Sequence, residues 1–490
     1  MKKLSVFVLL SAIVPPAPSP AASLRPCAVC GAFYSADADT LAAQAGGFIA
    51  GATSTVKTEG EVIGVLAPHA GYEFSGKTAG AAFAGIDSDY DTAVIIGTAH
   101  HAPVKAAALS DADFQTPLGT VSADAALIKK LAADKALFEI SGEAHAKEHS
   151  VEVQLPFLQR KLKKPFKLVP VIMNTGDYET AAAAGRALGR ALKGRKALIV
   201  ISSDLSHYPS AATARRVDET ALAAVETLDS GYFYLTDRIL LGHGEAGLEC
   251  AACGAAAIIA GMEAVKELGA NRAATVRYSN SGETGDPRRV VGYGAMVFTK
   301  AKTPSKFEWK LDAADKKILL AAAREAVASR LTGARFGAVL SDSPKLNLPA
   351  AVFVTITKDG NLRGCVGATE PRGTLYDSVA HFARAAAFED GRFRPVEQSE
   401  LEKLRYEISI LSVPEPVASP SAIKPKTHGV AISLDGRAGL FLPQVWDSLP
   451  DKAGFLSELC EQKAGLPRDC WKNPRAKLSV FTVYSFEDTK

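Results

Sequence analysis

The sequence predicts an α/β protein in which a central, mostly parallel sheet flanked by helices is followed by a smaller second unit. Between about residues 60 and 300, short β-branched runs alternate with Ala-rich stretches that have helical apolar spacing. Such alternation is typical of a parallel sheet covered on both faces. The polar, Pro-containing segment AKTPSKFEWKLD then interrupts the pattern, and a new helix begins after it. We therefore place a boundary near residue 305, with domains at 24–303 and 304–490.

The expected elements follow one another in a regular order along the first domain. Four runs predict strands that end in polar turns: EVIGVLAPH, DTAVIIGTAHH, FKLVPVIM and KALIVISSDLSH. Three stretches predict helices between or after them: SADAALIKKLAA, ETAAAAGRALGRALKG and ATARRVDETALAAVETL. VVGYGAMVFTK reads as a last strand before the boundary, and DAADKKILLAAAREAVASRLTG opens the second domain as a helix.

Composition excludes some classes of function. The 490 residues are 47% hydrophobic and 22% charged, as in folded globular proteins. The 56 basic and 53 acidic residues give a net charge of only +3, and no basic stripe is interleaved with aromatics. We therefore expect no nucleic-acid partner.

The N-terminus predicts export. MKKLSVFVLLSAIV has two lysines and then an apolar core of about ten residues, which is typical of a signal peptide. The run is shorter than the roughly 20 residues of a membrane-spanning helix, the alternative interpretation. We expect a signal peptide over residues 1–23, a periplasmic or extracellular location and no membrane association after its removal. In an oxidising compartment, Cys27 and Cys30 of CAVC are either a disulfide or idle thiols.

Chemically capable side chains follow three of the four predicted strands. His69 follows the first strand, His100 and His101 follow the second, and Asp204 and His207 follow the last. Ligands of open α/β sheets bind at the carboxyl ends of the strands, so we expect these groups to meet. A further candidate is Cys253, which opens an Ala-rich helix, where the thiolate that binds metals is favoured.

Two other interpretations compete for the same residues. His145, Glu148 and His149 fit the H-x-x-E-H pattern of zinc proteases, in which both imidazoles bind zinc from one helix face. The cluster of Ser202, Ser203, Asp204 and His207 contains the groups of a serine hydrolase, but no G-x-S-x-G elbow exposes a nucleophile.

The ordered motifs of the first domain resemble those of Memo-like proteins. They are RPCAVCGAFY, APHAGYEFSG, IIGTAHHAPV, EHSVEVQLPFL, ISSDLSHY and the Cys253 helix, over about residues 25–300. The resemblance implies a fold like that of class III extradiol dioxygenases, with His69, His100 and Cys253 as metal ligands. Asp204 and His207 then match pocket residues that move a proton, and His101, Glu148 and His149 support the ligands.

Two imidazoles and one thiolate favour a single transition metal ion, iron or copper first and zinc next, over magnesium or calcium. The resemblance thus implies an oxidoreductase related to the dioxygenases, acting on an unknown small molecule or peptide. A non-catalytic metal-binding or interaction module is the alternative, because the ring-cleaving relatives use a carboxylate where this chain has a thiolate. The zinc protease is the third hypothesis.

The second domain resembles the AMMECR domain through LRGCVGATEP, FEDGRFRPVEQSELEKLRYEISILS and HGVAISLDGRAGLFLPQV. This implies an α+β fold with an antiparallel sheet. In LRGCVG, Arg363 offers a planar cation, Gly364 and Gly367 permit close backbone approach, and Cys365 supplies a thiol. Cys365 is either a nucleophile activated by His381 or His428, or part of a tightly packed strand and turn. The domain pair is similar to AmmeMemoRadiSam systems, which implies association with a radical S-adenosylmethionine protein.

Overall fold

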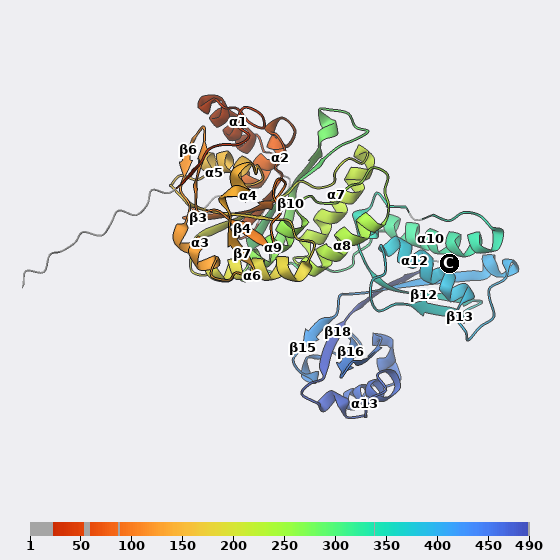
Figure 1. Ribbon diagram of the computed structural model, residues 1–490. Helices are drawn as coiled ribbons and strands as arrows, with labels where there is room; N and C mark the ends of the chain where they lie inside the picture. The colour runs from red at the N-terminus through yellow and green to blue at the C-terminus, as the bar shows by residue number, and fades with distance from the viewer. Residues whose placement is uncertain (1–22, 53–58, 87–88, 338, 489–490) are drawn as a thin grey trace, which may run out of the picture.

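The computed structural model describes residues 23–52, 59–86, 89–337 and 339–488 (Figure 1). The predicted signal peptide therefore lies, except for its last residue, outside the described part of the chain. Within those ranges, no helix combines the length and the apolar character that crossing a membrane requires.

An eight-stranded sheet forms the centre of the first half. Its four middle strands run parallel, in the order β2 (Glu61–Ala67), β9 (Ala197–Ser202), β3 (Thr92–Thr98) and β8 (Lys167–Met173). Further strands extend both edges. Beyond β2, β11 (Gly292–Lys300) pairs antiparallel, and β10 (Arg272–Asn280) pairs antiparallel to β11. Beyond β8, β4 (Ala107–Leu109) pairs antiparallel, and β7 (Phe138–Ile140) pairs parallel to β4. The predicted α/β class is confirmed. The first four predicted strands are the parallel ones, and the last, VVGYGAMVFTK, is the antiparallel β11.

Helices cover both faces of this sheet because successive strand residues point to opposite sides. On β3, Val94 and Ile96 pack into one core, while Ala93 and Ile95 pack into the other. The first core is closed by α3 (Ala125–Leu131), α6 (Tyr178–Leu192), α7 (Ala211–Glu226), α8 (Ser230–Gly242) and α9 (Ala255–Glu267). The second is closed by α1 (Ala38–Ala50), α2 (Tyr72–Ala84) and α5 (Leu155–Lys161).

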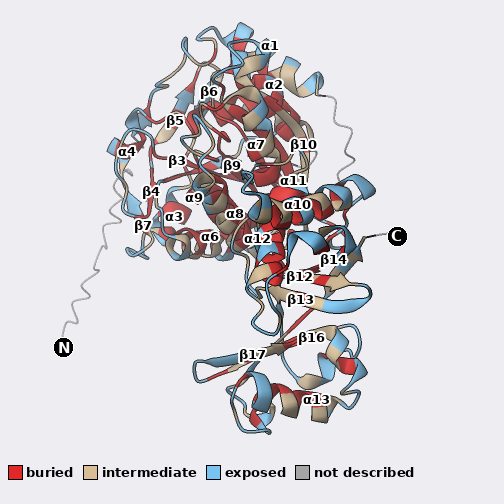
Figure 2. Cartoon of the chain, turned by 90° about the vertical axis from the view of Figure 1, so that its right-hand side faces the viewer, coloured by how far each residue is buried: buried red, intermediate tan, exposed pale blue. Residues whose placement is uncertain are grey.

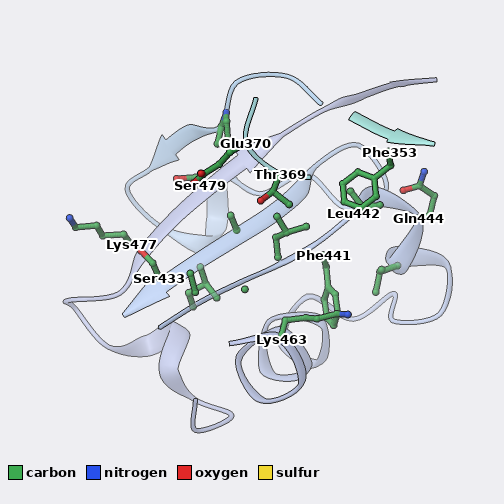
Figure 3. Close-up of a pocket in the computed structure, with 17 residues that line it drawn as sticks. Phe353, Thr369, Glu370, Ser433, Phe441, Leu442, Gln444, Lys463, Lys477 and Ser479 are labelled. Carbon is green, nitrogen blue, oxygen red and sulfur yellow. The ribbon is translucent and has the colours of Figure 1, made fainter. Parts of the chain in front are cut away.

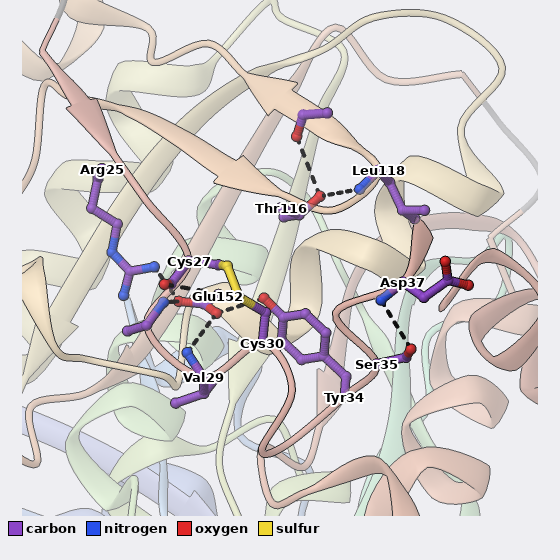
Figure 4. Close-up of a disulfide and its surroundings, with 12 residues drawn as sticks. Arg25, Cys27, Val29, Cys30, Tyr34, Ser35, Asp37, Thr116, Leu118 and Glu152 are labelled. Carbon is purple, nitrogen blue, oxygen red and sulfur yellow. Dashed lines mark hydrogen bonds and ion pairs between the residues drawn. A yellow bond between two sulfur atoms is a disulfide. The ribbon is translucent and has the colours of Figure 1, made fainter. Parts of the chain in front are cut away.

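The first described residues are anchored to this half. Strand β1 (Leu24–Arg25) pairs with β5 (Asp113–Thr116), which pairs in turn with β6 (Gly119–Val121). Cys27 and Cys30 form a disulfide beside the buried Glu152 (Figure 4). Of the two states expected for this pair, the structure has the disulfide, whereas Cys250 and Cys253 are free thiols.

The second half contains two four-stranded antiparallel sheets. The larger has the order β13 (Asn361–Gly367), β12 (Ala351–Lys358), β14 (Leu404–Leu411) and β19 (Val483–Glu487), and α10 (Ala313–Thr332) and α12 (Leu375–Phe388) pack on it. The smaller has the order β15 (Glu415–Val417), β18 (Lys477–Phe481), β16 (Gly429–Leu434) and β17 (Arg437–Phe441), and carries α13 (Lys452–Glu458). The expected α+β class with antiparallel sheets is confirmed.

The two halves share one apolar core. Buried residues of α8, such as Phe233 and Leu240, belong to the same packed cluster as Leu348 and Val379 of the second half. The Tyr232 hydroxyl crosses the junction and donates to the carbonyl of Pro349 at 2.7 Å. Figure 2 shows the buried residues concentrated on the sheets and on the helix faces that cover them. The small sheet and α13 lie away from this junction (Figure 1).

Candidate metal centre

The carboxyl ends of three adjacent parallel strands bring the candidate residues together. In the order β2, β9, β3, each strand is followed after one intervening residue by a polar side chain: His69, Asp204 and His100. These neighbours in space are far apart in the chain, and only the parallel arrangement of the strands places them at one edge.

His69, His100 and Cys253 form one compact group. One nitrogen of each imidazole and the Cys253 Sγ all lie within 4.8 Å of one another. His69 Nε2 is 3.2 Å from Cys253 Sγ, and the two imidazole rings meet edge to face with centroids 5.1 Å apart. Cys253 lies just before α9, where its N–H donates to the Asp204 carbonyl at 3.3 Å. The structure therefore places the three expected ligands within reach of one ion.

A hydroxyl sets the tautomer of His69. Ser202 Oγ donates its single proton to the Ser150 carbonyl at 2.6 Å, so it can only accept at its other contacts. His69 Nδ1, 3.1 Å from Ser202 Oγ, must then carry the proton, which leaves the Nε2 lone pair facing Cys253. Burial lowers the pKa of His69 to about 3, so the ring stays neutral. Neutral imidazole is the form that binds metals.

A carboxylate orients His100 in the same way. Glu148 accepts from His100 Nδ1 at 3.0 Å and from the His100 backbone N–H at 2.7 Å. Burial raises the pKa of Glu148, but hydrogen bonds from His100 and from the Ser150 N–H outweigh it and hold the pKa well below its usual range. An ionised Glu148 keeps the proton on Nδ1 and leaves His100 Nε2 free.

The rings of His149 and His101 both lie near His100 and 6.0 Å from each other, but they differ in burial. The His149 ring stacks on His100 with centroids 4.5 Å apart and an interplanar angle of 18°, and Phe33 covers its other side. His100, Glu148 and His149 form a second group with metal-ligand spacing. His101 is exposed, with its ring centroid 6.3 Å from that of His100, so it does not pack behind the ligand as expected.

Asp204 and His207 lie beside these residues and form, with Cys253, a third such group. Asp204 accepts from the backbone N–H groups of His69 at 2.8 Å and Ala70 at 3.3 Å, and burial raises its pKa. Burial lowers the pKa of His207, and its buried Nε2 has no hydrogen-bond partner among the described residues. An unsatisfied buried nitrogen beside a carboxylate is suited to holding or passing a proton.

The zinc-protease interpretation is wrong in its geometry. Helix α4 (Gly142–Ala146) ends before His149, so His145 and His149 do not share a helix face. His145 is buried, with Nε2 3.0 Å from the Ala108 carbonyl, and belongs to none of the metal-ligand groups found among the described residues. The serine-hydrolase interpretation also loses its nucleophile, because Ser202 and Ser203 donate to backbone carbonyls.

The LRGCVG motif is a packing element of the second half. A Cβ on Gly364 would lie 2.0 Å from the Ala386 carbonyl oxygen of α12, and one on Gly367 would lie 2.4 Å from that of Val352. Arg363 makes a two-nitrogen contact with Glu400, at 3.1 and 3.0 Å. Of the two interpretations of this motif, these contacts support the tightly packed strand.

The thiol of this motif also lacks the expected base. Cys365 Sγ is 3.4 Å from the Thr355 hydroxyl. His428 Nδ1 instead accepts from the Lys424 backbone N–H, and the His381 ring packs against Phe382. Neither histidine has a recorded contact with Cys365, so the described structure gives the nucleophile interpretation no support.

Residues that sequence reasoning missed are the polar groups beneath His69. Gln154 is fully buried, and its amide donates to Ser202 Oγ and to the Pro68 carbonyl, both at 2.9 Å. The sequence suggests Ser202 only as a nucleophile, whereas in the structure it fixes the His69 tautomer. No local pattern reveals this relay, because its members are 48 to 133 positions apart.

A buried carboxyl next to this pocket should give stability a distinct pH dependence. Burial raises the pKa of Asp218 to about 7, although hydrogen bonds from the Ser206 N–H and the Tyr278 hydroxyl lower it. The folded state therefore binds more protons than the unfolded state between about pH 4 and 7, and Asp218 costs stability as the pH rises through that window. We expect Asp218→Asn to gain stability relative to the parent chain across this window in urea denaturation. If the free energies of unfolding of the two proteins changed with pH in the same way, this expectation would be contradicted.

Comparisons with known proteins identify both domains. The family described as "Memo-like protein" matches residues 25–297, and "AMMECR1" matches residues 320–486. A MEMO1 family protein of Aquifex aeolicus is 40% identical over 237 residues, covering 48% of this chain and 85% of its own length. One of Archaeoglobus fulgidus is 35% identical over 272 residues, covering 55% and 97%. The crystal structure of an uncharacterized Pyrococcus horikoshii protein matches 35% of this chain and 89% of its own, with 34% identity and a TM-score of 0.32.

These matches cover most of both domains of the chain. The first match spans more than half of the sequence, and the Aquifex and Archaeoglobus relatives are covered over most of their length. The chain belongs to the Memo-like protein family and carries an AMMECR1 domain after its Memo-like domain.

Proposed function

We propose that the Memo-like half binds one transition metal ion through His69, His100 and Cys253 and uses it in an oxidoreductase reaction. The observation that carries the proposal is the convergence of these three side chains, with both imidazoles held in the tautomer that leaves Nε2 unprotonated. Among the three overlapping groups found in the described residues, this one combines two imidazoles, each oriented by a hydrogen bond at Nδ1, with a sulfur.

The donor chemistry supports iron or copper first and zinc next. Imidazole and thiolate ligands suit these ions, whereas magnesium and calcium require oxygen ligands. Cys253 binds only as the thiolate, and burial raises the pKa of its thiol. Metal uptake would therefore release a proton and strengthen as the pH rises.

The chain's own residues suit a proton-transfer step beside the ion. A redox-active metal would supply the electron transfer, as in the dioxygenase-related enzymes that share the fold. His207, with its free buried Nε2 and the nearby Asp204, would accept a proton from a substrate and return it. Glu148 would keep His100 oriented without itself reacting.

The substrate class, the partner and the location are proposed from the sequence alone. We propose a small-molecule or peptide substrate, functional association with a radical S-adenosylmethionine protein, and an exported protein that is periplasmic or extracellular. The apolar leader with its two lysines supports export, and the association of the two domain types supports the partner.

Metal content of single variants tests the assignment of the ligands. We expect the purified chain to hold about one transition metal ion and His100→Ala to hold less than about a tenth of that, because one of three ligands is lost. His101→Ala is the matched control, since His101 is the exposed neighbour and should retain the metal. Equal metal in both variants, or loss on His145→Ala alone, would overturn the proposal.

Oxygen uptake distinguishes the enzyme from a non-catalytic metal-binding module, the second candidate function. The observation that favours the module is that the thiol ligand lies among buried residues beside a carboxyl group, which suits tight retention of an ion. We expect metal-loaded protein to consume oxygen with candidate catechols or peptides, and His207→Ala to lose this while keeping its metal. Metal binding without turnover across such a panel would support the module.

A further inference from the structure

The second half contains a cavity of about 730 Å³ at the open side of the larger sheet. It lies between the end of β12 and β13 on one side and the small sheet with its helical turns on the other (Figure 3). Its size falls within the range of about 300–1,000 Å³ that is usual for small-molecule sites. It is far in the chain from the metal centre and shares no residue with it.

The walls of the cavity are mainly apolar. Phe353, Leu440, Phe441, Leu442 and Val445 contribute most of the large side chains. Phe441 is buried, whereas Phe353, Leu440 and Leu442 are only partly buried against a small cluster. An apolar ligand that covered these surfaces would gain the free energy of removing them from water.

One exposed cation, Lys463, lies at this apolar wall, and its backbone is held in place. Lys463 ends the π-helical turn Leu459–Lys463, whose Cys460 is joined to Cys470 by a buried disulfide. The backbone of Lys463 also packs on Gly439 of β17, where a Cβ would lie 2.6 Å from the Lys463 carbonyl carbon. The π-helical turn, the disulfide and this contact together hold Lys463 beside the cavity. Such turns often occur at functional sites.

The charge of Lys463 is uncompensated. The nearest acidic residues in the same segment, Glu458 and Glu461, are both paired with Arg468. Lys463 has no recorded carboxylate partner among the described residues. Glu370 is the one carboxylate among the lining residues, is exposed, and lies on the opposite side of the cavity (Figure 3).

Lys477, the second lysine that lines the cavity, points in a different direction from Lys463. Lys477 extends away from the cavity, whereas Lys463 runs beside it below Phe441 (Figure 3). The acidic residue near Lys477, Asp435, is paired with Arg475. Lys477 therefore provides an internal control that has the same charge and the same lack of a partner, but a different orientation.

We propose that this cavity binds a small monocarboxylate with an apolar body, such as an aromatic or medium-chain aliphatic acid. The apolar body lies on the Phe353, Leu440 and Phe441 surface, and the carboxylate pairs with Lys463. Lys463 supplies one positive charge, and Glu370 lies across the cavity from it. A ligand with one negative charge is therefore favoured over a dianion, because Glu370 would repel the second negative charge. The site is independent of the metal centre and of its proposed reaction.

Calorimetric titration of the full chain with decanoate tests the site. We expect saturable binding of one decanoate per chain, about threefold to fivefold weaker in Lys463→Ala, the usual range for one exposed ion pair. Lys477→Ala should bind as the parent does. Decylamine, which has the same apolar body and the opposite charge, should bind more weakly than decanoate.

A second variant keeps the test independent of charge. Ala438 lines the cavity and is exposed, so Ala438→Phe should fill it without disturbing the core, and it should weaken decanoate binding by about tenfold or more. Equal weakening by Lys463→Ala and Lys477→Ala, equal affinity for decylamine, or full binding by Ala438→Phe would each overturn the proposal. Unchanged circular dichroism spectra would confirm that the variants are folded.

Discussion

Replacing Glu152 with glutamine is expected to lower the free energy of unfolding of the Memo-like half by about 3–5 kcal/mol, the usual cost of breaking a buried ion pair. Glu152 is fully buried and forms an ion pair with Arg25, which is itself 5% exposed. Its carboxylate also accepts from the N–H groups of Ala28 at 2.7 Å and Val29 at 3.1 Å, and from the Tyr34 hydroxyl (Figure 4). Glutamine keeps the volume but leaves the Arg25 charge without its counterion.

Denaturation by urea, followed by circular dichroism, measures this effect. Glu143→Gln is the matched control, because Glu143 is exposed in the preceding helical turn and should change stability by less than about 0.5 kcal/mol. The double variant Arg25→Met with Glu152→Gln should be more stable than Glu152→Gln alone, since an amide oxygen remains as acceptor and no charge is then left buried and unpaired. A single variant as stable as its control would show that the pair contributes little.

The second large effect is expected at Gly364. A methyl group there would meet the Ala386 carbonyl oxygen at 2.0 Å, so β13 and α12 would have to separate. Overpacking of this kind costs about 1–3 kcal/mol and sometimes more, and a backbone clash belongs at the upper end. We expect Gly364→Ala to destabilise the second half by about 3 kcal/mol in the same denaturation experiment.

Gly391→Ala is the control for this prediction. Gly391 lies in the segment that follows α12, and nothing would lie within 4 Å of an added Cβ. Its replacement should therefore be close to neutral. If both glycine variants unfold alike, the close contact between β13 and α12 is not what requires glycine in this motif.

Much of the architecture could be predicted because its causes are local. The four parallel strands were visible as apolar runs, and parallel strands have only one carboxyl edge at which to place His69, His100 and Asp204. The outer strands were harder to predict, apart from β11, which the run VVGYGAMVFTK indicated. For example, β4 and β7 have only three residues each, too few to show a periodicity.

The parts of the site that sequence could not reveal depend on long-range contacts. The tautomer of His69 follows from a hydroxyl relay through Ser202 to Ser150, and the orientation of His100 follows from Glu148. The H-x-x-E-H pattern misled because its three residues match a motif whose chemistry requires a continuous helix, and here the helix ends at Ala146. The spacing of residues in a motif fixes their positions relative to one another only when the backbone conformation between them is known.

The apolar cluster that spans the junction between the halves limits how the protein can be divided for experiments. If the chain were cut at residue 305, Phe233 and Leu240 on one fragment and Leu348 and Val379 on the other would lose their cover and face water. Exposed apolar patches of this kind promote self-association. Fragments made to study either half alone would then precipitate for a reason unrelated to its function, so point variants of the intact chain are the sounder tool.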